Sequence, residues 1–154
     1  MENLKESGFF NNDVLLKIDK QIFNVDGKEI ETNLFNNIKA KYAIFTYKEN
    51  AKEYAKLNKP LYASTDDAAQ MFGHKINCVK DNPKTNCLIY EKGFVATGRT
   101  INEMVASCIL IEKLCRIELL SNRIGHVHYL PGFLCRLEHI VYLKSYSKKA
   151  IENE

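Results

Sequence analysis

The stretch of sequence that decides the fold is residues 87–120, CLIYEKGFVATGRTINEMVASCILIEKLCRIELL. Its first part predicts two short strands, over residues 87–91 and 94–96, because apolar runs flank a turn signal at Lys92 and Gly93. Its second part predicts a long helix. A strand pair that leads directly into a helix indicates a domain built from both kinds of element.

The start and the end of this helix are both marked in the sequence. Thr100 and Glu103 have the spacing of a capping box, in which the two side chains satisfy free N–H groups of the first turn. The helix is expected to run to about Ile124, and Gly125 suits the position after its end.

Strands and helices alternate along the rest of the chain as well. Thr65 is placed to cap a short helix that Gly73 would end, and residues 32–38 are ambiguous but compatible with a short helix. This alternation predicts one layered α/β domain over residues 1–154, with residues 1–11 as a flexible N-terminal segment. The further strands are expected at residues 14–18, 21–25, 41–46 and 75–79, and the further helices at residues 48–57, 66–72 and 132–149.

Composition narrows the class of protein. The chain is 45% hydrophobic and 27% charged, which is typical of a soluble globular domain, and its net charge of +3 comes without a basic run that would indicate nucleic-acid binding. The polar N-terminus and the absence of a long apolar stretch predict a cytoplasmic protein with no membrane contact. Five cysteines without a C-x-x-C pair argue against a disulfide framework and against a thiolate zinc site.

The long helix carries two apolar stripes, whereas a surface helix needs only one. We therefore expect the sheet to cover one stripe, and the C-terminal helix or a second subunit to cover the other. The first stripe consists of Met104, Cys108, Ile111 and Cys115, and the second of Leu110, Leu114 and Ile117.

A second block, residues 41–79, reads KYAIFTYKENAKEYAKLNKPLYASTDDAAQMFGHKINCV. Together with residues 87–120 it resembles the class II aldolase/adducin family, and the likeness extends over roughly residues 12–124. Thr46, Lys59 and Pro60 stand where that family has a Thr and a Lys-Pro. The resemblance implies a three-layer αβα domain around a central, mainly antiparallel sheet.

The resemblance also implies a metal site, and here the sequence departs from the family. Family enzymes hold a divalent metal with three histidines. Phe45, Tyr47 and Lys92 occupy those positions in this chain. Phenylalanine cannot ligate a metal, lysine is cationic near neutral pH, and a lone tyrosine makes a poor site. We therefore expect the three side chains to lie close together without a metal, and we expect no cofactor.

Other residues remain candidates for chemistry. Glu31 weakly matches the acid/base glutamate of the family, and Tyr47 and Lys92 could form a new acid/base pair if Lys92 lay in an apolar pocket. His126 and His128 lie on one side of an extended segment, so they could begin a metal site if Glu138 or His139 supplied a third ligand.

These observations favour a non-catalytic class II aldolase/adducin-like domain that acts as a binding or assembly module. The expected partner is a second copy of the chain, or a full-length relative in a hetero-oligomer. The alternative is a divergent sugar-phosphate aldolase or epimerase, a lyase with a relocated or metal-free active site. The sequence identifies no small-molecule ligand for either function.

Overall fold

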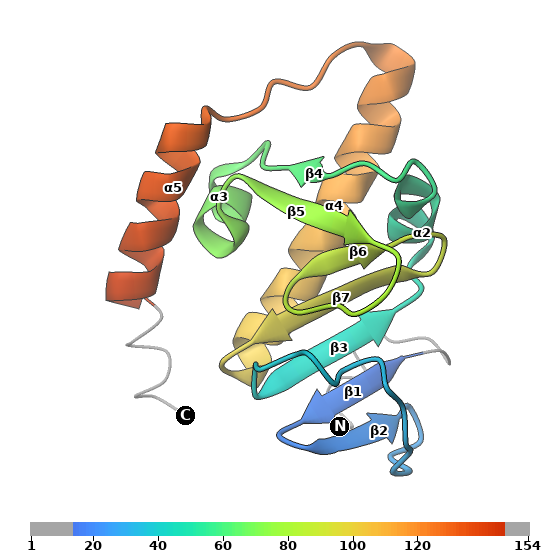
Figure 1. Cartoon of the computed structure of the whole chain (residues 1–154). Coiled ribbons are helices and arrows are strands. Elements are labelled where there is room, and N and C mark those ends of the chain that lie inside the picture. Colours follow the sequence, from blue (N-terminus) through green and yellow to red (C-terminus); the bar gives the residue numbers. More distant parts are fainter. Residues whose placement is uncertain (1–13, 147–154) are drawn as a thin grey trace.

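The computed structural model describes residues 14–146 and contains one seven-stranded sheet with the order β2-β1-β3-β7-β6-β5-β4 (Figure 1). Neighbouring strands are antiparallel except for β5 and β6, which are parallel. The mainly antiparallel α/β fold expected from the sequence is therefore confirmed. The strands are β1 (Leu15–Ile18), β2 (Gln21–Asn24), β3 (Tyr42–Thr46), β4 (Leu61–Tyr62), β5 (Lys75–Val79), β6 (Cys87–Ile89) and β7 (Gly93–Gly98).

Two helices, α2 (Glu49–Ala55) and α4 (Ile101–Ile124), pack together on one face of the central strands (Figure 1). Two others, α3 (Asp66–Phe72) and α5 (Gly132–Val141), pack against each other beside the sheet. Every residue of β7 is buried, so both faces of this central strand are covered. None of the described helices is long and apolar enough to cross a membrane.

The junction of β7 and α4 shows how the deciding stretch folds. The Thr100 side chain accepts a hydrogen bond from the Glu103 N–H at 3.1 Å, as the capping box predicts. The Glu103 carboxylate reaches one residue further back than expected and accepts from the Arg99 N–H at 2.7 Å. A Cβ atom on Gly98 would lie 2.3 Å from the Met104 backbone nitrogen, so only glycine lets the strand run this close to the helix.

The local structure differs from the sequence predictions in three places. Residues 32–38 form turns, and Phe35 and Ile38 anchor them in the core. The two-residue strand β4 was not expected, because so short a segment has no periodicity to detect. The last helix, α5, ends at Val141 and continues as a π-helical turn over Tyr142–Tyr146; the rest of the helix expected to residue 149 lies outside the described residues.

The second stripe of α4 is not an open face. Leu114 is only 1% exposed, and Leu110 and Ile117 are half-buried, all within a single chain. Its burial removes the reason for expecting a second subunit on this stripe. The first stripe is fully buried, as expected; its members are Met104, Cys108, Ile111 and Cys115.

Candidate functional site

The positions that the sequence resemblance assigns to the family's metal ligands lie at one end of two neighbouring strands. Thr46 of β3 pairs with Phe94 of β7, so Tyr47 leaves β3 at the end where Lys92 enters β7. The backbones touch there: a Cβ atom on Gly93 would lie 2.2 Å from the Thr46 carbonyl oxygen. Gly93 has φ +137°, a conformation that other residues rarely adopt, so the turn itself requires glycine.

The side chains at these positions do not fit a divalent metal. The Phe45 ring is buried and packs edge-on against the Tyr47 ring, with 4.6 Å between their centroids. Phe45 has no ligating atom, and the Lys92 side chain is exposed. Among residues 14–146, no group of three histidine, cysteine, aspartate or glutamate side chains could hold a metal ion.

The same geometry bears on the acid/base hypothesis. A lysine that acts as a base near neutral pH needs a desolvated surrounding, and the exposed Lys92 has none. Glu31 is also exposed and lies near the outer edge of the sheet. It follows Ile30, whose N–H donates to the Ile22 carbonyl of the outer strand β2, and β1 separates β2 from β3. The structure therefore does not bring Glu31 into the β3–β7 end.

Within the described part of the chain, the two-histidine segment also lacks the third ligand that a metal site would need. His126 and His128 are exposed in the connection between α4 and α5. His139, one of the expected third ligands, instead donates from Nδ1 to the Gln70 carbonyl of α3 at 2.6 Å. This bond joins α5 to α3 and gives His139 a structural role.

Sequence reasoning missed the orientation of α5. The residues that face α3 and its surroundings include polar ones: Cys135 is buried, and Glu138, His139 and Tyr142 are half-buried. Several large apolar residues of α5 are instead exposed, and we call them the outer row of α5. Its members are Phe133, Leu137, Ile140 and Val141, all of them exposed. Their spacing predicts one apolar stripe, but nothing in that spacing says that the stripe faces away from the domain.

Sequence reasoning also missed a buried carboxyl. Glu118 falls four residues after Leu114 and seven after Ile111, so its spacing places it on the buried side of α4. This helical spacing is the signal in the sequence from which the burial of Glu118 could have been predicted.

Comparison with solved structures identifies the fold. An L-fuculose 1-phosphate aldolase superposes with a TM-score of 0.72 at 13% identity, over 92% of this chain and 92% of that chain. The chain has a class II aldolase-like fold. An L-fuculose 1-phosphate aldolase from Glaciozyma antarctica PI12 gives a TM-score of 0.69 at 16% identity, over 89% of this chain and 76% of that chain. YgbL from Escherichia coli superposes with a TM-score of 0.63 at 10% identity, over 89% of this chain and 92% of that chain.

No protein-family model matches the chain, and no curated protein matches it in sequence. At identities this low, the likeness to these class II aldolase-like structures establishes the architecture and leaves the activity open.

Proposed function

We propose that this chain is a non-catalytic assembly module with a class II aldolase-like fold, and that it associates with a second copy of itself through the outer row of α5. The observation that carries the proposal is the orientation of α5. A helix on a globular domain normally buries its apolar stripe and exposes its polar one. Here Phe133 is 76% exposed and Leu137 is 56% exposed.

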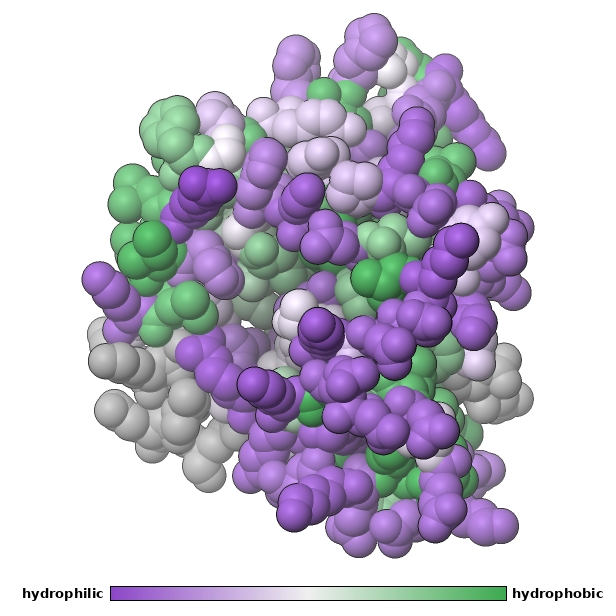
Figure 2. All heavy atoms as spheres, viewed as in Figure 1, coloured by the Kyte–Doolittle hydropathy of each residue, from purple (hydrophilic) through white to green (hydrophobic). Residues whose placement is uncertain are grey.

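The outer row forms a continuous apolar surface along one side of the molecule. Figure 2 shows hydrophobic residues gathered over α5, on the side away from the sheet. An exposed apolar patch of this kind is typical of an interaction surface. The inner side of α5 already has its own partners, because it packs on α3, so the outer row is the side that remains for association.

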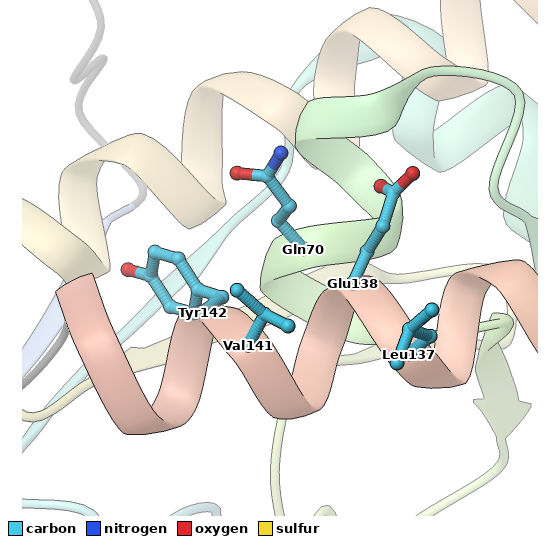
Figure 3. A pocket seen from close by; sticks show the side chains of 5 residues that line it. All are labelled: Gln70, Leu137, Glu138, Val141 and Tyr142. Carbon is cyan, nitrogen blue, oxygen red and sulfur yellow. The ribbon is translucent and has the colours of Figure 1, made fainter.

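A second copy is the occupant that this surface fits best. Leu137 and Val141 stand beside a cavity of about 300 Å³ that Gln70, Glu138 and Tyr142 also line (Figure 3). This side of α5 thus offers protruding side chains, and α5 and α3 together form a hollow next to them. A twofold dimer uses the same patch on both subunits, so it needs this combination of projection and recess on a single surface.

The non-catalytic part of the proposal rests on the chemistry of the β3–β7 end. Phe45 cannot ligate or transfer a proton, and Lys92 is exposed. By the sequence resemblance, Phe45, Tyr47 and Lys92 stand in place of the family's three histidines, and this replacement supports a role without metal-dependent chemistry at the β3–β7 end.

Sedimentation velocity over roughly 1–100 μM protein tests the association, since a specific interface would bury on the order of 1,200 Å² or more in total. Wild-type protein should form a dimer within this range. Leu137→Glu should weaken it at least tenfold, because each subunit would bury an unpaired charge. Leu120→Glu is the matched control: Leu120 is 47% exposed on α4, and its replacement should leave the dimer intact.

A wild-type monomer at 100 μM would refute self-association. If such a monomer bound a full-length relative with the same fold, and Leu137→Glu abolished that binding, the partner would be the hetero-oligomeric one expected from the sequence.

The alternative function is a sugar-phosphate aldolase or epimerase with a relocated site. The specific observation in its favour is the fold, which this chain shares with L-fuculose 1-phosphate aldolases. Cleavage or epimerisation of sugar phosphates by purified protein, with and without added divalent metal, would detect it. Turnover that Tyr47→Phe and Lys92→Met each abolish, while both variants remain folded, would overturn the non-catalytic proposal.

A further inference from the structure

A buried carboxyl on α4 has one oxygen that nothing in the described protein satisfies. Glu118 is 4% exposed, and its Oε2 accepts a hydrogen bond from the Tyr129 hydroxyl at 3.0 Å. Its Oε1 is buried and has no hydrogen-bond partner among residues 14–146. Buried polar atoms are nearly always hydrogen-bonded, and an unsatisfied one lowers stability, so this oxygen calls for an explanation.

Glu118 is one of the residues that line a cavity of about 330 Å³, and three tyrosines also line it. Tyr54 comes from α2, Tyr62 from β4 and Tyr129 from the α4–α5 connection. The rings of Tyr62 and Tyr129 lie 5.4 Å apart between centroids. The Tyr54 hydroxyl already donates to the Pro60 carbonyl at 3.0 Å, so that hydroxyl is not left to satisfy Glu118.

We propose that this cavity binds a small organic ammonium ion, whose N–H groups donate to Glu118 and whose charge lies among the tyrosine rings. Aromatic faces attract cations, and a carboxylate is the complementary anion for an ammonium group. An anionic ligand would instead meet the charge of Glu118. The volume is at the lower end of the range for small-molecule pockets, which suits a ligand of few atoms.

The charged and titratable groups around Glu118 determine how binding depends on pH. Tyr54, Tyr129 and Cys115 interact with it electrostatically, and Lys59 is exposed where it lines the same cavity. Burial raises the pKa of Glu118, and the hydrogen bond from Tyr129 partly opposes that rise. As the pH falls through this raised pKa, Glu118 becomes neutral and ammonium binding should weaken.

A titration of ¹⁵N-labelled wild-type protein with benzylamine, followed through backbone amide shifts, tests the proposal. Benzyl alcohol and benzoate are the matched ligands, since they keep the ring and replace the cation with a neutral or an anionic group. Glu118→Gln removes the charge with little change in shape. Glu138→Gln is the control variant, because Glu138 also carries a buried oxygen without a described partner but lies outside this cavity.

Benzylamine should give saturable shifts at the cavity residues, and benzyl alcohol and benzoate should not. Glu118→Gln should weaken benzylamine binding at least tenfold, whereas Glu138→Gln should keep wild-type affinity. Equal binding of benzyl alcohol, unchanged affinity in folded Glu118→Gln, or no saturable shift at tens of millimolar benzylamine would each overturn the proposal.

Discussion

Replacing Gly98 with alanine should destabilise the protein through the junction between β7 and α4. The new Cβ atom would lie 2.3 Å from the Met104 nitrogen and 2.7 Å from the Thr100 carbonyl oxygen. Ordinary contact begins near 3.4 Å, so the strand and the first turn of the helix must separate by about 1 Å. Both obstructing atoms belong to the backbone, which cannot rotate away as a side chain could.

The expected cost lies at the upper end of the range for overpacked sites, about 2–3 kcal/mol. Moving the helix start would also displace Met104, whose side chain is completely buried. For a chain of this size, such a loss corresponds to a fall in Tm of roughly 4–12 °C. Urea unfolding followed by far-UV circular dichroism and by tyrosine fluorescence measures it, since the chain contains eight tyrosines and no tryptophan.

Gly125→Ala is the matched control for this measurement. A Cβ atom on Gly125 would meet nothing within 4 Å, so its stability should stay within about 0.5 kcal/mol of wild type. A Gly98→Ala protein as stable as Gly125→Ala would show that β7 and α4 do not pack as closely as described. The close strand–helix contact would then no longer account for glycine at this position.

Two further changes test the buried side of α4. Glu118→Gln should alter the pH dependence of stability, because burial raises the folded-state pKa of Glu118 above its value in the unfolded chain. The stability of the wild type relative to the variant should therefore fall as the pH rises above the ordinary carboxyl pKa, by at most about 1.4 kcal/mol per pH unit. It should level off above the folded-state pKa. Urea titrations between about pH 4 and 8 would show this, and parallel pH profiles would contradict it. Leu114→Glu should prevent stable folding rather than only dissociate a dimer, because Leu114 is buried within one chain, and circular dichroism would separate the two outcomes.

The sequence predicted the fold where local chemistry is strong. Thr100 caps α4 as its spacing with Glu103 indicated, and Thr65 caps α3 by accepting a bond from the Ala68 N–H at 3.3 Å. The strands of three or more residues were found because their apolar patterns are long enough to recognise. The two residues of β4 were not, since their place in the sheet comes from pairing with Ile76 and Lys75, which are distant in sequence.

The candidate site was harder to predict, because it depends on which residues become neighbours. The resemblance implied that Phe45, Tyr47 and Lys92 stand at corresponding positions, and the β3–β7 register puts Tyr47 and Lys92 at the same end of these two strands. Whether Lys92 would be enclosed or exposed depends on the surrounding connections, which no local pattern encodes. For the same reason, the spacing of Glu118 indicates burial but does not reveal that Tyr129 would satisfy only one of its oxygens.

The orientation of α5 shows why an apolar stripe alone cannot assign a buried face. The inner side of this helix is fixed by specific polar contacts: His139 donates to the Gln70 carbonyl, and the Tyr142 hydroxyl donates to Glu103 at 3.4 Å. The connection before it is held as well, since the Leu130 N–H donates to the Ala63 carbonyl at 3.1 Å. These bonds hold the helix with its outer row exposed, and rotating that row inward would break the two side-chain bonds. A helix held this way keeps its apolar face exposed, as the proposed association with a second copy requires, whereas a helix held only by hydrophobic packing would bury that face in its own domain.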